Sequence, residues 1–143
     1  MPASSICLDA SFVVGLVTHP QRDRLRRHLE AWQDGGSRLV APALLHYEVV
    51  NAFYQYQRHG KLGAGAVDSS LAMVTSLPIE VTSDALLHQD ALTLARELEL
   101  PAAYDAHYLA LAQRLDGEVW TMDRKLARHV EGRFPDLRLA TED

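Results

Sequence analysis

The sequence has a single cysteine, no excess of positive charge and no long apolar run. Because Cys7 is alone, an internal disulfide and a cysteine-based zinc cluster are both excluded, and we interpret it as a buried structural thiol. No apolar run reaches the roughly 18 residues that span a membrane. The N-terminus lacks the basic start and the long apolar stretch of a signal peptide, so we expect a cytoplasmic protein without a membrane partner.

The charge balance excludes a further class of protein. With 14 Lys and Arg against 19 Asp and Glu, the net charge is −5, so a uniformly basic nucleic-acid binder is not expected. Local basic patches are compatible with this total, because a bound divalent cation offsets part of the acidity. The seven histidines have neither the HExxH nor the HxH spacing of metal sites, and we interpret them as ordinary surface or helix residues.

Four acidic residues stand out because each lies within apolar sequence. They are Asp9 in ICLDASFVV, Glu48 in LLHYEVVNAFY, Asp105 in AYDAHYLALAQ and Asp123 in VWTMDRKLA. An unpaired charge in apolar surroundings is costly. Four such acids without matching bases suggest one shared pocket, and a pocket of carboxylates typically holds a hard metal ion.

Length and patterning favour one domain over residues 1–143. A hydrophobic content of 48% is enough for one sizeable core. Strands are predicted to alternate with helices, which is typical of an α/β sandwich with a mainly parallel sheet. The predicted strands cover 4–9, 37–42, 79–82, 117–123 and, as a final edge strand, 135–140. The predicted helices cover 11–17, 20–33, 43–60, 64–77, 83–100, 103–116 and 124–132.

The predicted topology brings the four acids towards one edge of the sheet. Ligands of such sheets bind outside the carboxyl ends of the strands. Asp9 and Asp123 each come just after a predicted strand, whereas Glu48 and Asp105 lie near the start of predicted helices. All four side chains can therefore reach the same edge.

The chemistry of such a cluster favours a bound cation. Two unit charges about 4 Å apart repel by roughly 4 kcal/mol at an effective dielectric constant near 20, so several such pairs need protonation or a cation. A site made only of oxygen ligands selects Mg²⁺ or Mn²⁺ over Zn²⁺. One or two such ions activate a water and stabilise a phosphodiester transition state, which makes hydrolysis without a protein nucleophile the simplest hypothesis.

Each acid also has an ordinary interpretation. Asp9, Asp105 and Asp123 are placed to cap the helices that follow them, with Ser11 as an alternative cap beside Asp9. Glu48 is placed to be a partly exposed helix residue. A capping carboxylate can also bind a metal, so these interpretations do not exclude the cluster.

Four other residues are supporting candidates for the same site. Asn51 lies three residues after Glu48 on the same helical face, where it can orient Glu48 or contact substrate. Ser11 and Thr121 can supply hydroxyls, or merely bond to nearby backbone. Asp90 is a fifth acid, with an exposed helix position as its ordinary interpretation.

The segments LDASFVV, LLHYEVVNAF, YDAHYLALA and TMDRKLA together resemble a PIN-domain ribonuclease, and most of all the VapC-type toxins of bacterial toxin–antitoxin pairs. The resemblance runs from about residue 5 to about residue 130 and keeps all four acidic positions. It implies a three-layer α/β/α sandwich in which Asp9, Glu48, Asp105 and Asp123 bind Mg²⁺ or Mn²⁺ and form the catalytic site. It also implies an endoribonuclease of structured or messenger RNA that is usually a homodimer and is inhibited by an antitoxin segment at the active site. His46 and Tyr47 depart from the family pattern and leave the choice of RNA open.

An acidic protein that cuts RNA needs local positive charge for phosphate contacts. Arginines and a lysine gather in 22–27 and in 124–128, the latter directly after Asp123, although a solvated helix face is the ordinary interpretation of each. Aromatic side chains can stack on bases, with apolar packing as the default. The aromatic candidates are Tyr54, Tyr56 and Tyr108.

Other functions for an acid-rich α/β chain are weaker or stay open. A haloacid-dehalogenase-type phosphatase needs Asp-x-Asp after its first strand, but Ala10 and Ser11 follow Asp9. A phosphoacceptor receiver domain needs an early acidic pair and a late lysine after a strand, and neither is present. A non-catalytic PIN-like module that binds RNA or protein remains the alternative.

Overall fold

The protein is known from a computed structural model that describes residues 4–141, so both ends of the predicted domain, residues 1–3 and 142–143, lie outside the described part. Strands and helices alternate along the chain as expected. In order they are β1 (Ser5–Leu8), α1 (Ala10–Thr18), α2 (Arg22–Asp34), β2 (Arg38–Pro42), α3 (Leu44–Arg58), α4 (Ala64–Ser76), β3 (Ile79–Thr82), α5 (Ala85–Glu97), α6 (Tyr104–Arg114), β4 (Glu118–Thr121), α7 (Arg124–His129) and β5 (Leu137–Leu139).

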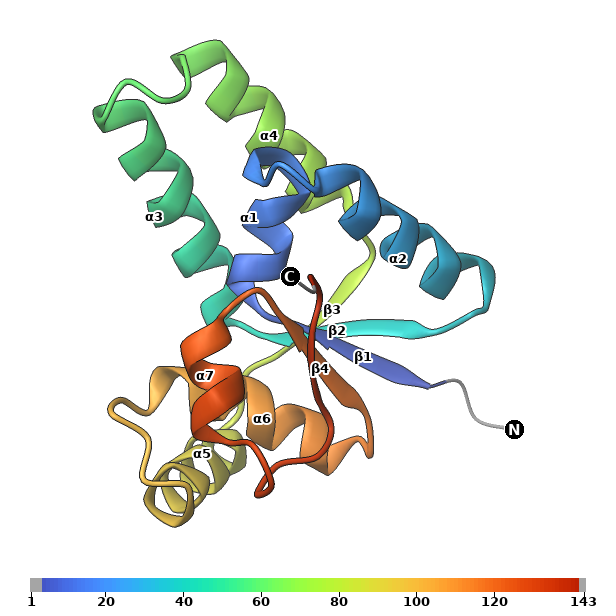
Figure 1. The fold of residues 1–143 in the computed structure, drawn as a ribbon, viewed down its shortest axis with the longest axis vertical. Helices are drawn as coiled ribbons and strands as arrows, with labels where there is room; N and C mark the ends of the chain where they lie inside the picture. Colours follow the sequence, from blue (N-terminus) through green and yellow to red (C-terminus); the bar gives the residue numbers. More distant parts are fainter. Residues whose placement is uncertain (1–3, 142–143) are drawn as a thin grey trace.

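The sheet is parallel throughout its described strands, in the order β3-β2-β1-β4-β5. Helices α1 to α4 lie on one side of it and α5 to α7 on the other (Figure 1). This arrangement confirms the predicted three-layer α/β/α sandwich. The edge position of β5 confirms the prediction for the last strand.

The chain direction across the sheet reverses beside β1. After β1 the chain forms β2 and β3 on one side, then returns to place β4 on the other side of β1. The connections that leave β1 and β4 therefore run in opposite directions, which opens a crevice above the carboxyl ends of these neighbouring strands. The backbone N–H of Asp9 donates to the carbonyl of Trp120 at 3.1 Å, which keeps the two strand ends side by side.

The core lies on both faces of the central strands. All four residues of β1 are buried, as expected for a strand covered by helices on both sides. Phe12, Phe53 and Tyr108 are among the largest fully buried side chains. Burial raises the pKa of the Cys7 thiol, which confirms its interpretation as a buried structural thiol.

Several helices end earlier than predicted, and two of them are followed by a residue of positive φ that is not glycine. Helix α5 stops at Glu97 rather than at residue 100, and α6 stops at Arg114 rather than at residue 116. Glu99 and Asp116 follow these two helices with φ of 52° each. This left-handed conformation is common just after a helix, where the residue is usually glycine. Within residues 4–141, no helix is both long enough and apolar enough to cross a membrane.

Candidate metal centre

Asp9 lies at the carboxyl end of β1, in the crevice beside β4. Its side chain is only 6% exposed. It occupies the N-cap position of α1 but makes no side-chain cap hydrogen bond, so the predicted capping role is wrong. Its Oδ2 atom instead accepts hydrogen bonds from Thr121 Oγ1 at 2.5 Å and from Ser11 Oγ at 3.0 Å.

The two hydroxyls around Asp9 are themselves held by the β4–α7 connection. Ser11 Oγ accepts from the backbone N–H of Met122 at 2.9 Å, and Thr121 Oγ1 accepts from that of Asp123 at 3.0 Å. Each hydroxyl thus accepts from this connection and donates to Asp9. Ser11 and Thr121, two of the supporting candidates, thus both contact Asp9 and couple the end of β1 to the end of β4.

Glu48 reaches the same region from the second turn of α3. It is partly buried, and its Oε1 atom accepts a hydrogen bond from the Tyr108 hydroxyl at 2.6 Å. Burial, followed by this hydrogen bond, raises the pKa of Tyr108, so the phenol keeps its proton. Since Tyr108 is 1% exposed, it is unavailable for base stacking and that candidate role is wrong.

Asp105 and Asp123 enter from the starts of two helices. Ala103 occupies the N-cap position of α6 and Asp105 lies within its first turn, so the predicted cap at Asp105 is wrong. Asp123 does cap α7, because its Oδ1 atom accepts from the backbone N–H of Leu126 at 3.1 Å. Asp105 and Tyr108 lie three residues apart on α6, which brings a carboxylate and a positioning hydroxyl to one helical face.

Neighbouring carboxylates contribute to the raised pKa values of three of the four acids. Burial first, then the charges of Asp9, Asp123 and Glu48, raises the pKa of Asp105 to about 6. Burial is also the main cause of the raised pKa of Asp9, with a contribution from Asp123, and of Glu48, with a contribution from Asp9. Each of the four carboxylates therefore interacts with at least two of the others.

The donors gathered here suit a hard cation in their chemistry. They are carboxylate oxygens, supported by hydroxyls, which are the ligands that Mg²⁺ and Mn²⁺ prefer. As the side chains are placed, no group of three or more His, Cys, Asp or Glu in residues 4–141 is arranged to hold a metal ion. The cluster is thus defined by the burial of its carboxylates and by the repulsion between them. Its side chains do not form a complete set of metal ligands in the described residues.

Two supporting candidates lie apart from this cluster. Asp90 is on α5, where its carboxylate is 3.7 Å from Arg114 Nη2, an ordinary paired helix position. Asn51 is exposed on α3 and accepts a hydrogen bond from Gln55 Nε2 at 3.5 Å. No hydrogen bond joins Asn51 to Glu48 among the described residues, so the predicted orienting contact is not formed.

The basic segment 22–27 is partly used within the fold. Arg26 Nε donates to the carbonyl of Leu16 at 2.9 Å, which ties α2 to α1. Arg27 is exposed and Arg24 is half-buried beside His28, whose pKa is lowered by burial and then by these two charges. This segment is therefore only in part a free basic surface.

Comparison with known proteins gives a family match over most of the chain. The PIN domain family matches residues 6–132. Ribonuclease VapC3 of Pyrobaculum aerophilum is 30% identical over 135 residues, which is 92% of this chain and 96% of that relative.

Solved structures have the same fold. A crystal structure from Pyrobaculum aerophilum matches with a TM-score of 0.66 at 29% identity and covers 92% of this chain and 90% of its own. A toxin–antitoxin complex from Klebsiella pneumoniae matches with a TM-score of 0.67 at 14% identity and covers 96% of this chain and 99% of its own. Mycobacterium tuberculosis VapC20, a sarcin–ricin loop cleaving toxin, matches with a TM-score of 0.62 at 18% identity and covers 90% of this chain and 95% of its own. The last two similarities bear on the fold alone.

Proposed function

The chain belongs to the PIN-domain family, and from this premise we propose that it is a Mg²⁺- or Mn²⁺-dependent endoribonuclease that hydrolyses RNA phosphodiester bonds. The observation that carries the proposal is the set of mutually repelling acids Asp9, Glu48, Asp105 and Asp123 at the switch point of the sheet. The name of the VapC3 relative, a ribonuclease, supports RNA as the substrate.

The roles of the acids follow from their surroundings. Asp9 is held by Thr121 and Ser11 and serves as the fixed ligand, whereas Glu48 is oriented by Tyr108. A divalent cation, when bound, supplies positive charge to the scissile phosphate and lowers the pKa of the attacking water. Because Asp105 holds a proton more readily than an ordinary carboxyl, cation binding at neutral pH completes its ionisation.

We further propose that the protein is the toxin of a toxin–antitoxin pair and acts in the cytoplasm, where its RNA substrate is found. The VapC name of the relative and the toxin–antitoxin complex among the similar structures support this role. We also propose that the toxin forms a homodimer, which needs an apolar surface for the second copy of the chain. Helix α3 exposes Tyr47, Val50 and Tyr54 at 76%, 48% and 55%, an apolar patch that suits the proposed homodimer.

Cleavage assays test the enzymatic proposal. The wild type is expected to cut RNA with Mg²⁺ or Mn²⁺, and EDTA is expected to abolish cleavage. Asp9→Asn and Glu48→Gln are expected to abolish cleavage and keep a wild-type circular dichroism spectrum, with Asp90→Asn as the active control. Wild-type rates in both Asp9→Asn and Glu48→Gln would overturn the metal-site assignment. A wild type that binds RNA without cutting it would favour the non-catalytic binding module.

Growth and solution mass test the proposed partners. Expression of the wild type is expected to arrest growth, and a small protein from the adjacent reading frame is expected to relieve the arrest. Growth that is unaffected by an RNA-cleaving protein would contradict the toxin role. Light scattering is expected to give a dimer mass that falls to the monomer value in the double variant Tyr47→Ser, Val50→Asp.

A further inference from the structure

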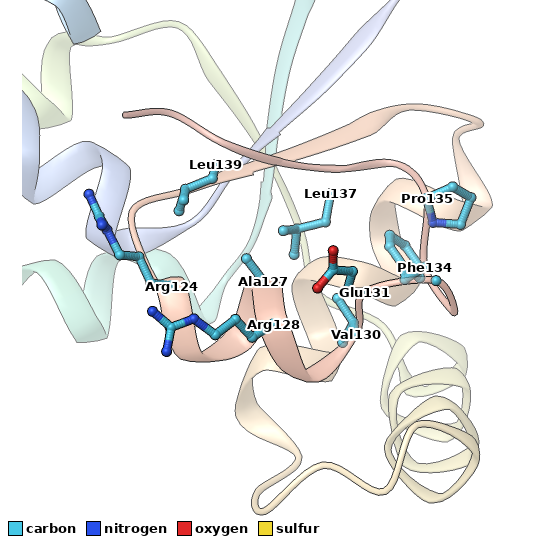
Figure 2. Close-up of a pocket in the computed structure, with 10 residues that line it drawn as sticks. Arg124, Ala127, Arg128, Val130, Glu131, Phe134, Pro135, Leu137 and Leu139 are labelled. Atoms are coloured by element: carbon cyan, nitrogen blue, oxygen red, sulfur yellow. The ribbon is translucent and has the colours of Figure 1, made fainter. Parts of the chain in front are cut away.

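A pocket of about 380 Å³ lies between α7 and β5, beside the acid cluster but formed by other residues (Figure 2). The two regions are adjacent because α7 begins at the residue after Asp123. Arg124 and Arg128 line one end of the pocket, and its walls include Val130 and Leu137. The pocket therefore lies next to the proposed cleavage site.

The pocket has basic side chains at one end and the carboxylate of Glu131 farther along, so its two ends suit different chemical groups. Arg128 is exposed, one helical turn after Arg124, and its guanidinium group suits a phosphate. The carboxylate of Glu131 lies farther along, between Leu137 and Phe134 (Figure 2). A phosphate backbone that followed the whole pocket would be repelled by the exposed carboxylate of Glu131, so this end of the pocket suits an uncharged group with hydrogen-bond donors.

We propose that this pocket is a nucleotide subsite that binds an unpaired guanine of single-stranded RNA next to the bond that is cut. Arg128 holds the flanking phosphate, and Glu131 accepts from the guanine base. The choice of guanine follows from its two adjacent donors, N1–H and the N2 amino group, which match the two oxygens of one carboxylate. The subsite deepens the proposed nuclease function and rests on it.

The apolar walls favour a base over a charged peptide side chain. Leu137 and Leu139 line the pocket and are half-buried, so they offer apolar contact to the flat faces of a base. Recognition of RNA by such sites requires bases that are unstacked from a duplex. The proposal is therefore restricted to loops, ends and other single-stranded regions.

Fluorescence anisotropy tests the subsite separately from cleavage. An Asp9→Asn protein is titrated with labelled eight-nucleotide RNAs that differ at one position, which is guanosine, inosine or uridine, in an otherwise uridine sequence. Inosine lacks the N2 amino group, so it removes one donor of the pair. Gels confirm that the RNAs stay intact. We expect the guanosine RNA to bind about tenfold more tightly than the uridine RNA, with inosine between them.

Two substitutions in the same background assign the effect to the pocket. Glu131→Gln is expected to remove the preference for guanosine over inosine and to leave the affinity for uridine RNA within about twofold. Arg128→Ala is expected to weaken all three RNAs by a similar factor and to lower the salt dependence of binding. The matched controls are Glu97→Gln and Arg96→Ala, which change exposed residues of the same types on α5.

The outcomes separate the subsite from the nuclease function. If the wild type cuts RNA but Glu131→Gln and Arg128→Ala bind like their parent, the subsite is wrong and the pocket is left for a protein segment. If the wild type cuts no RNA while Glu131→Gln removes the guanosine preference, the subsite stands as part of an RNA-binding module. If no RNA binds the Asp9→Asn protein, the subsite is overturned.

Discussion

Acidic side chains occupy two contrasting regions of this molecule. On the exposed surface of α5, Asp84 accepts hydrogen bonds from Arg114, and this contact holds the pKa of Asp84 below its usual value. At the switch point of the sheet, burial and neighbouring carboxylates raise the pKa values of Asp9 and Asp105. The same residue type is thus stabilised by a protein cation in one region, whereas the other region needs positive charge from a ligand.

Two helix caps give the sharpest test of this contrast. Asp123 and Asp84 each accept a hydrogen bond from the backbone N–H three residues ahead, at 3.1 Å and 2.7 Å. Since asparagine caps helices as well as aspartate does, Asp→Asn keeps both caps and removes only the charge. We expect Asp123→Asn to lower the rate of RNA cleavage by about a thousandfold, a loss typical of removing electrostatic stabilisation of a transition state.

The matched variant Asp84→Asn is expected to cleave RNA within about twofold of the wild-type rate, because it loses only an exposed ion pair. Equal cleavage by both variants would mean that Asp123 is a cap and no more. A large loss in both would mean that the two regions are coupled.

Thermal melting with and without divalent cations sharpens the comparison next. At a Mn²⁺ concentration about 100 times the dissociation constant, binding to the folded state adds about 3 kcal/mol to the free energy of unfolding. For a chain of this size the midpoint is expected to rise by roughly 5–10 °C. The rise should disappear in Asp9→Asn and persist in Asp84→Asn, and an equal rise in both would place the ion elsewhere.

The pH dependence of stability without metal gives a smaller effect. The folded-state pKa of Asp105, about 6, lies above its unfolded value near 3.9, so the folded state holds a proton that the unfolded chain releases. The free energy of unfolding in EDTA should therefore fall as the pH rises from about 4 to about 6, and this contribution should be constant above that. After allowance for the partial exposure of Asp105, the fall is about 1 kcal/mol.

The variant Asp105→Asn checks this assignment. It cannot release a proton, so its stability in EDTA should fall less over the same pH range and should exceed that of the wild type at pH 7. Chemical denaturation at several pH values measures both quantities. A slope in Asp105→Asn equal to that of the wild type would assign the titration to another group.

The smallest effect is expected in the paired region. Arg114 binds Asp84 at 2.8 Å and lies 3.7 Å from Asp90, but the side chains of both acids are nearly half exposed to solvent. Arg114→Ala is therefore expected to lower the free energy of unfolding by about 0.5 kcal/mol and to leave cleavage unchanged. Added salt should reduce this difference further, because it screens exposed charges.

The sequence predicted the topology of the sheet more closely than it predicted the contacts of the four acids. Alternating strands and helices determine which ends of the parallel strands meet at one edge, so Asp9 and Asp123, which follow neighbouring strands, come to the same edge whatever their rotamers. The hydrogen bond from Tyr108 to Glu48 joins residues 60 positions apart in the chain, and no local pattern contains it. Its one local sign is the spacing of three residues between Asp105 and Tyr108 on α6.

Caps and helix ends were the weaker predictions for a similar reason. Asp9 has the right residue type and position for a cap, but burial beside Thr121 and Ser11 takes its carboxylate away from the helix. Asp90 is also an acid in an apolar sequence context, but in the fold it lies beside Arg114 of α6, which pairs with it. Tertiary neighbours decide whether an acid is capped, paired or left for a ligand, and these neighbours are distant in sequence.

Isothermal titration of the metal-free protein with Mn²⁺ tests the central assertion most directly, namely that Asp9, Glu48, Asp105 and Asp123 form one divalent-cation site. We predict saturable binding by the wild type and by Asp84→Asn, and its loss in Asp9→Asn and Asp105→Asn with their folds unchanged. Binding that survives in both Asp9→Asn and Asp105→Asn, or a folded wild type that binds no Mn²⁺, would contradict it.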